Sequence, residues 1–344
     1  MPLHLSCLDS LTHIALGACI GEALEGKRLG KKSLWLGAIA QSLPDADFAA
    51  SFWSTPAGNL LAHRGFTHSI LFLLLIAPLL ALAARRYLHK PSLPFRSWLL
   101  FFGVQVAVHL LIDGFNVYGI GWFEPFDHAR ITFNWIFVAD PLYSIWPALA
   151  ALALWILRTG HPSRRNWRRL GLIMSTVYLL YCGINKWIVH RAVEEDLRSQ
   201  GIAYRDYFTT PAPLNSWLWY VVAATDSGYR VGYRSVFDKR EERMQYRYVP
   251  KNDSLLDPLR DRADIRQLIR FSRGYYAAYR QNDTLVYNDL RFGDQIGWMH
   301  PAAPFVFYYY PGHPRANRML IQRGRFTGWS GNALRSLWSR MRGH

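Results

Sequence analysis

Two short histidine-containing motifs lie at the ends of apolar segments in this chain. Residues 63–68 read His-Arg-Gly-Phe-Thr-His before one apolar segment, and residues 109–113 read His-Leu-Leu-Ile-Asp at the end of another. Ionisable side chains are costly beside hydrocarbon and usually serve a function there. Imidazole nitrogens and carboxylate oxygens are ligands of zinc and related divalent cations. The two motifs therefore predict a metal site at the ends of membrane-length helices.

The spacing within each motif indicates how its side chains are presented. His109 and Asp113 are four residues apart, so a helix places both on one face, where they can bind or bridge cations or form a polar contact between helices. His63 and His68 do not share a helical face, and their spacing suits a loop-to-helix junction at which Gly65 frees the backbone. Alternatively, the intervening threonine caps the helix and the histidines only lie at the interface.

Three further candidate ligands precede these motifs. Asp45 and Asp47 follow Pro44 at the end of an apolar segment, where two carboxylates suit a bridging role between cations. Aspartate is also common at ordinary turns. His13 lies in the first apolar segment, either as a ligand or as a packed histidine after a helix cap. The predicted metal ligands are His13, Asp45, Asp47, His63, His68, His109 and Asp113.

Three residues are predicted to take part in a reaction at this site: Arg64, Asp113 and Asp140. The Arg64 guanidinium suits the geometry of phosphate and would neutralise an anionic substrate. Asp113 would hold the metal that activates a water molecule. Asp140 would orient a histidine or a water, or would only start the next helix together with Pro141.

The composition predicts two unlike halves. Hydrophobic residues make up 51% of the 344 residues, yet the mean hydropathy is only -0.03. Long apolar runs fall in 1–190, which predicts a membrane-embedded, metal-binding helical domain. Residues 191–344 are polar and rich in tyrosine and arginine, which predicts a smaller α+β domain. The three cysteines lie far apart and predict neither a disulfide framework nor a thiolate zinc site.

The distribution of basic residues favours a membrane topology over nucleic-acid binding, although the net charge is +16. Of the 16 lysines and arginines in residues 1–190, 13 fall in three short stretches between apolar segments. Cytoplasmic loops of membrane proteins have this character. The stretches contain Lys27, Arg28, Lys31 and Lys32; Arg85, Arg86, Lys90 and Arg96; and Arg158, Arg164, Arg165, Arg168 and Arg169.

Six apolar segments are expected to form helices. Segments 69–84, 98–112, 142–157 and 170–189 approach the roughly 20 residues that cross a bilayer. Segment 33–52 is interrupted by polar residues and proline. Segment 11–24 carries Gly17 and Gly21 in a spacing that permits close helix contact. With the basic stretches in the cytoplasm, every candidate ligand and the second domain are expected on the outward face of the membrane.

The polar half is expected to mix strands and helices. We expect strands over 218–224 and 229–237, a helix over 257–279, and strands over 284–287 and 305–310. Residues 331–342 predict a basic helix, either amphipathic at a membrane surface or packed on its own domain.

Taken together, the motifs resemble a known family. The segments that carry the resemblance are 9–13, 43–47, 63–69, 109–113, 118–119, 125–126, 140–141 and 210–215. The chain resembles the LexA-binding, inner-membrane-associated metal-dependent hydrolases, or YdjM-like proteins. The ligand order is also similar to zinc-dependent phospholipase C and its relatives, all-α enzymes with clustered zinc ions that hydrolyse phosphoesters. This similarity implies that Asp45, His63 or His68, His109 and Asp113 hold more than one divalent ion, zinc or alternatively manganese.

The predicted fold is a multi-pass α-helical membrane bundle with a zinc phospholipase C-like all-α core, followed by the smaller α+β domain. The predicted function is hydrolysis of a phosphoester in a lipid-like substrate by a metal-activated water. Membrane lipid is an expected partner, nucleic acid is not, and the sequence identifies no protein partner. The main alternative is a non-catalytic binding or regulatory membrane protein with a structural metal site. A transporter is disfavoured because the ligands gather at one end of the helices rather than at the midplane.

Overall fold

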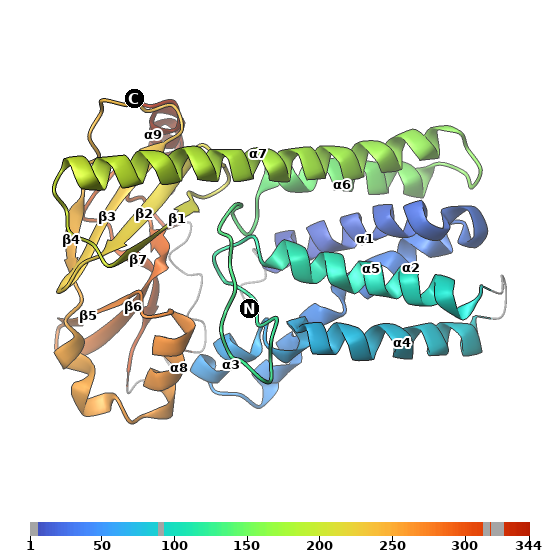
Figure 1. Cartoon of the computed structure of the whole chain (residues 1–344), viewed down its shortest axis with the longest axis horizontal. Coiled ribbons are helices and arrows are strands. Elements are labelled where there is room, and N and C mark those ends of the chain that lie inside the picture. The colour runs from blue at the N-terminus through green and yellow to red at the C-terminus, as the bar shows by residue number, and fades with distance from the viewer. Residues whose placement is uncertain (1–5, 89–92, 312–316, 318–326) are drawn as a thin grey trace.

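A helical half of the chain is joined to a half built on two β-sheets in the computed structural model, which describes residues 6–88, 93–311, 317 and 327–344 (Figure 1). Pro44 separates two helical elements because its ring cannot continue the preceding helix. The helical elements are α1 (Ser6–Leu29), α2 (Lys32–Ser42), η1 (Pro44–Phe52), α3 (Pro56–Ala62), η2 (Phe66–His68), α4 (Ile70–Tyr87), α5 (Phe95–Asp113), α6 (Pro141–Ile156) and α7 (Ser163–Ser199).

Six of these helices, α1, α2, α4, α5, α6 and α7, run along a common axis (Figure 1). The turns from α1 to α2 and from α6 to α7 lie at the end far from the sheets, and Arg85 and Arg86 end α4 there. The opposite end carries η1, α3, η2 and residues 114–140. The described residues thus confirm that basic stretches and candidate ligands lie at opposite ends of the bundle. Lys90, in the second basic stretch, lies outside the described residues.

Three helices within the described parts of the chain are long and apolar enough to cross a membrane. They are α4, α5 and α7, with 18, 19 and 37 residues, and α6 is a shorter apolar helix. Large apolar side chains such as Leu74, Leu79 and Leu82 of α4 point outward, as expected of a helix surrounded by lipid. The six predicted helical segments are confirmed as helices, with segment 33–52 divided between α2 and η1.

Helices α1 and α2 pack against each other through small residues, as the glycine spacing predicts. A Cβ atom on Gly17 would lie 2.5 Å from the carbonyl oxygen of Gly37, and one on Gly21 would lie 2.1 Å from that of Ser33. Only glycine permits this approach of two backbones. At the basic end, α1 and α7 are joined by a buried ion pair, in which Arg164 donates to both carboxylate oxygens of Glu22 at 2.9 and 2.7 Å.

The described residues of the second half form two antiparallel sheets and the short helical elements η3, α8 and α9. One sheet has the order β1-β2-β3-β4, and the other has the order β5-β6-β7. The elements are β1 (Asp206–Pro211), β2 (Leu218–Ala224), β3 (Gly228–Ser235), β4 (Arg247–Pro250), η3 (Asp253–Leu259), α8 (Ala263–Phe271), β5 (Tyr276–Gln281), β6 (Thr284–Asp294), β7 (Phe305–Tyr309) and α9 (Gly331–Met341).

Most predicted elements of this half are confirmed, but the helix expected over 257–279 is wrong in its last part. The chain leaves α8 through Gly274, which has a φ of 80°, and then forms β5. In β5, Tyr276 pairs with Asp289 of β6. Sheet pairing here outweighs the helical preference of the two alanines that follow Tyr276. Strands β1 and β4 were not predicted.

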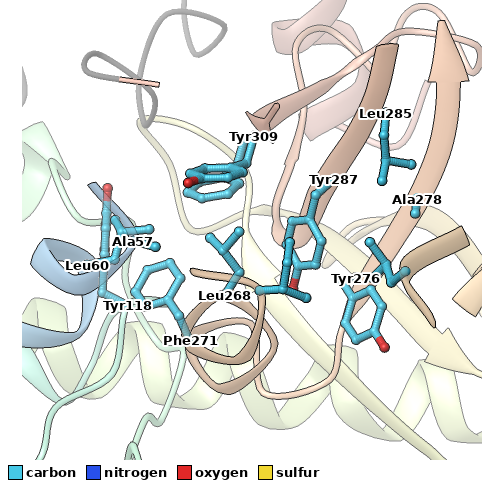
Figure 2. Close-up of a cluster of buried hydrophobic side chains, with 13 residues drawn as sticks. Ala57, Leu60, Tyr118, Leu268, Phe271, Tyr276, Ala278, Leu285, Tyr287 and Tyr309 are labelled. Atoms are coloured by element: carbon cyan, nitrogen blue, oxygen red, sulfur yellow. The ribbon is translucent and has the colours of Figure 1, made fainter. Parts of the chain in front are cut away.

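The two halves share a helix and a hydrophobic core. Helix α7 passes unbroken from the bundle to the sheets, so the domain boundary expected at residue 190 falls inside it, and Val193 and Leu197 pack beneath β2. A second contact joins Leu60 of α3 and Tyr118 to a cluster that includes Leu268 and Phe271 around α8 (Figure 2). The sheet-containing domain therefore packs against the end of the bundle that carries the candidate ligands.

Candidate metal centre

Four predicted ligands meet at the end of the bundle next to the sheets. One donor atom from each of Asp45, His68, His109 and Asp113 lies within 4.8 Å of all the others. The Nε2 atoms of His68 and His109 are 3.1 Å apart, and Oδ2 of Asp113 is 3.2 Å from the first and 3.6 Å from the second. Oδ1 of Asp45 is 3.6 and 3.7 Å from the same two nitrogens.

These distances fit a cation. Ligand atoms about 2.0–2.1 Å from one tetrahedral zinc ion lie about 3.4 Å from each other, close to the separations found here. Two buried imidazole nitrogens that face each other cannot both be satisfied when both are neutral acceptors. The mixture of two imidazoles and two carboxylates suits zinc, and it also suits manganese. The four residues therefore fit a divalent metal ion.

The local sequence explains how each donor reaches this point. His109 and Asp113 share one face of α5, as predicted from their spacing, and both are fully buried. Asp45 follows Pro44 in the first turn of η1, and His68 ends η2. The helix after His68 is capped by Ser69, whose Oγ accepts from the backbone N–H of Phe72 at 3.0 Å. The alternative in which Thr67 caps that helix is therefore wrong.

Asp47 lies beside the four donors rather than among them. Its Oδ2 accepts from the backbone N–H of Arg64 at 2.7 Å and from the Thr67 hydroxyl at 3.1 Å, and it lies 3.2 Å from Nδ1 of His68. Its Oδ1 lies 2.9 Å from Nδ1 of His63. A carboxylate on Nδ1 fixes the imidazole and leaves Nε2 for a metal. Asp47 thus orients His68, and it holds His63, which is 40% exposed, at the margin of the cluster.

The turn that presents His68 is built by close backbone contacts. Arg64 has a φ of 59°, and Arg130 donates to its carbonyl oxygen at 3.0 Å and to those of Leu61 and His63. A Cβ atom on Gly65 would lie 2.9 Å from the carbonyl oxygen of Ala62, so close approach rather than a left-handed φ requires glycine there. Arg130 is not among the site residues predicted from the motifs. Its one signal is its position as a lone basic residue in the otherwise acidic and aromatic connection 114–140.

Arg64 is part of the centre. It is 2% exposed, its Nε lies 3.1 Å from Oδ2 of Asp113, and its Nη1 donates to Asn116 at 2.6 Å. His13 lies on the other oxygen of the same carboxylate, with Nε2 3.2 Å from Oδ1, and its ring is 4.0 Å from that of His109. Asp113 therefore joins the four-donor group to His13.

Asp140 occupies a different structural role. Its Oδ1 accepts from the backbone N–H groups of Leu142 and Tyr143 at 2.9 and 3.2 Å, and its Oδ2 accepts from the Tyr178 hydroxyl at 2.9 Å. These contacts are those of a cap at the start of α6, the second of the two predicted roles. Asp9 begins segment 9–13, one of the segments that carry the family resemblance, and its side chain lies outside the described part of the chain.

Charge explains the protonation of the metal-free cluster. Burial opposes a positive charge on His68, but hydrogen bonds to the carboxylates of Asp113, Asp45 and Asp47 outweigh it and raise the His68 pKa to about 10. Burial also opposes ionisation of Asp45, but contact with His68 and the charge of His109 lower the Asp45 pKa to about 2. The same balance, with His63 and His68 as partners, lowers the Asp47 pKa. A proton on His68 thus supplies the positive charge that a metal would bring.

Sequence comparisons identify the family. The profile of the family described as "YdjM inner membrane protein" matches residues 8–189, more than half of the chain. The chain belongs to the YdjM inner membrane protein family. It is 34% identical to Inner membrane protein YbcI of Escherichia coli (strain K12) over 127 residues, which cover 36% of this chain and 72% of YbcI. It is 24% identical to Uncharacterized protein YfhP of Bacillus subtilis (strain 168) over 339 residues, which cover 94% of this chain and 95% of YfhP. No solved structure matches the chain.

The YdjM family region contains the whole candidate centre. The four donors, together with His13, Asp47, Arg64 and Arg130, all lie within the matched residues 8–189. The two sheets lie outside that region, and the match to YfhP extends over them. The centre thus belongs to the part of the chain that the YdjM family defines.

Proposed function

We propose that the chain is a metal-dependent hydrolase of the inner membrane that cleaves a phosphoester of a lipid-like substrate. The observation that carries the proposal is the group of two histidines and two aspartates whose donor atoms converge within 4.8 Å. A divalent metal bound there supplies Lewis acidity and a nucleophilic water at neutral pH. The similarity of the ligand order to zinc-dependent phospholipase C supports a phosphoester as the substrate. A phospholipase C-like fold of the bundle stays a prediction.

Exposed aromatic residues at both ends of the bundle support multi-pass insertion. Trp35, Tyr87 and Trp155 are exposed at the basic end. At the ligand end the exposed aromatic residues include Phe48, Phe52, Trp53, Phe66, Phe123 and Phe126. Between the two groups lies α4, whose 18 residues span about 27 Å, close to the roughly 30 Å of a bilayer core. Aromatic side chains concentrate at both membrane interfaces, so the metal centre lies at the level of the lipid headgroups.

The charge rule gives the orientation. Basic stretches remain in the cytoplasm, so the metal centre and the sheet-containing domain face outward. Asp45 lies in η1 together with the exposed Phe48 and Phe52, and at 23% exposure it is the accessible member of the four donors. A substrate that approaches Asp45 therefore comes from the bilayer interface, where phospholipids present their phosphoesters.

Side chains around the donors prepare the site for this reaction. Arg64 pairs with Asp113 and adds positive charge that favours an anionic phosphoryl group nearby. Asp47 holds the His68 ring in position, and Arg130 holds the turn between His63 and His68. His63 is exposed on one side and is available for proton transfer to a leaving group.

Metal content of the detergent-purified protein tests the proposal. Elemental mass spectrometry compares the wild type with the double variant His109→Ala/Asp113→Ala and with the matched control Asp127→Ala/His128→Ala, which alters an exposed pair on the 114–140 connection. We expect stoichiometric zinc or manganese in the wild type and the control, loss of metal in the double variant, and release of products from phospholipid vesicles that follows metal content. A folded wild type that binds no metal after supplementation contradicts the proposal.

One observation favours a non-catalytic alternative. His68, His109 and Asp113 are fully buried, and the cavity beside them, lined by His63, Arg64, Arg130 and Phe271 among others, has a volume of only about 60 Å³. A buried metal with little space beside it is typical of a structural site. Chelation separates the two functions, because removal of a structural metal lowers the unfolding temperature strongly, whereas removal of a catalytic metal abolishes turnover in a folded protein.

A further inference from the structure

A polar cavity of the sheet-containing domain lies outside the metal centre and outside the family region. It has a volume of about 380 Å³ and lies between β3, the connection 238–247, residues 294–301 and α9. Its size is at the lower end of the range for small-molecule sites. Four of its lining residues are arginines: Arg234, Arg243, Arg247 and Arg340.

Two of these arginines are matched by buried carboxylates. Arg340 binds Asp238 through both terminal nitrogens, the longer contact being 2.8 Å. Arg247 donates to Asp294 at 2.6 Å, and the Tyr233 hydroxyl donates to the other oxygen of that carboxylate at 3.2 Å. Each of these two carboxylates is thus paired with an arginine, and the third acidic lining residue, Glu242, is exposed.

The other two arginines leave positive charge in the wall. Arg234 is buried, and its terminal nitrogens donate to the backbone carbonyls of Glu242 and Lys239 at 2.6 and 2.8 Å. Its Nε makes no hydrogen bond, and the nearest carboxylate oxygen, of Asp238, lies 3.7 Å away. Arg243 is exposed and forms no ion pair with any residue that the structure describes. A buried guanidinium without a hydrogen-bonded anion is costly unless a ligand compensates it.

The walls also contain an unused neutral donor and aromatic surface. The indole N–H of Trp298 is buried and makes no hydrogen bond. The rings of Trp298, Tyr233 and Tyr246 line the same cavity. Charged donors fix an oxygen-rich group, while aromatic rings contact the apolar body of a ligand.

We propose that this cavity binds a small organic anion, whose phosphate or carboxylate oxygens accept hydrogen bonds from Arg234, Arg243 and Trp298. The site is independent of the metal centre. It gives the outward domain a ligand-binding role of its own, in agreement with the position of that domain outside residues 8–189.

Calorimetric titration of the full chain in detergent tests this proposal. The probes are phenylphosphonate, benzoate and inorganic phosphate. Phenylphosphonate carries an aromatic ring and has no ester bond that a phosphoester hydrolase could cleave. We expect saturable binding of phenylphosphonate or benzoate, about tenfold weaker in Arg243→Gln because a charge-assisted hydrogen bond is lost, and weaker again when Trp298→Phe removes the N–H but keeps the ring. The matched control is Arg240→Gln, which removes the same charge from an exposed arginine paired with Glu195 and outside this cavity.

The same titration in the His109→Ala/Asp113→Ala variant separates this site from the metal centre. Organic-anion binding that persists there, and that Arg243→Gln still weakens, supports the cavity whether or not the proposed hydrolase activity exists. The proposal is overturned when neither organic probe binds saturably at millimolar concentration. Equal effects of Arg240→Gln and Arg243→Gln, or binding of phenylphosphonate that disappears with the metal ligands, would also overturn it.

Discussion

Asparagine at position 47 separates a residue that orients a ligand from a residue that is a ligand. Asp47→Asn keeps the size and shape of the side chain and removes its charge. In the structure Oδ2 of Asp47 contacts the backbone N–H of Arg64, the Thr67 hydroxyl and Nδ1 of His68. Oδ1 contacts Nδ1 of His63. The asparagine oxygen can take the place of Oδ2. Its amide N–H can donate to Nδ1 of His63 when the proton of that ring is on Nε2. The number of hydrogen bonds is conserved, and the loss is confined to charge.

The expected magnitude follows from that loss. Charge-assisted hydrogen bonds are about twice as strong as neutral ones, and changes in partners of ligating histidines weaken metal binding by about 10–100-fold. This range corresponds to about 1.4–2.7 kcal/mol of metal-binding free energy. Asp113→Asn removes the negative charge and one of the two oxygens from a residue that contacts the other donors directly, so we expect it to weaken binding far more than Asp47→Asn.

Competition with a zinc chelator on the detergent-purified protein measures both affinities. Asp127→Asn is the control, because this exposed aspartate lies on the 114–140 connection and accepts one hydrogen bond from Ala129. Two results refute the reasoning. Wild-type affinity in Asp47→Asn would show that His68 needs no carboxylate on Nδ1. A loss as complete as that of Asp113→Asn would make Asp47 a ligand itself, as the sequence analysis predicts.

Three further predictions concern protons, helix contact and a buried charge. The pKa of His68 is raised to about 10 in the metal-free protein, so the ring carries its extra proton below that pH, whereas a metal needs the neutral ring. Metal binding at neutral pH should therefore release about one proton, and the metal affinity should rise with pH up to about 10. Calorimetry in buffers of different ionisation enthalpy measures the number of protons released. Gly21→Ala should destabilise the bundle by about 1–3 kcal/mol, whereas Gly103→Ala, whose Cβ would meet only Ala77 at 4.0 Å, should leave thermal unfolding in detergent unchanged. Arg164→Met should cost about 3–5 kcal/mol by leaving Glu22 buried without its partner, and adding Glu22→Gln should recover much of that loss; equal unfolding temperatures of the single and double variants would contradict this.

Periodicity and charge predicted the parts of the fold that depend on local rules. The four-residue spacing of His109 and Asp113 places them on one face because both belong to the single helix α5. The basic stretches lie at one end of the bundle because successive membrane-length helices return the chain to the same side. These rules were sufficient to predict that Asp45 and His68 lie at the same end of the bundle as His109 and Asp113, although they gave no distances between the side chains.

The roles within the cluster depend on contacts that no spacing encodes. Asp45 and Asp47 are two residues apart, yet the first faces Nε2 of His68 and the second faces Nδ1. Their different roles follow from the short helical turn that begins at Pro44. Arg130 could not be placed either, because residues 114–140 lack regular secondary structure and are fixed by hydrogen bonds to the backbone of the 61–64 turn.

The relation between the two halves bears on how the centre is assembled. Every donor lies within residues 8–189, and the match to YbcI covers only 36% of this chain. The four donors come from η1, η2 and α5, and His13 comes from α1, so none of the four belongs to the sheets. In this chain, however, Phe271 closes the cavity beside His63 and Arg64, and Arg270 donates to Glu124 on the connection 114–140 at 3.2 Å. The sheet-containing domain thus lies against His63 and Arg64 beside the candidate centre and contributes none of its four donors.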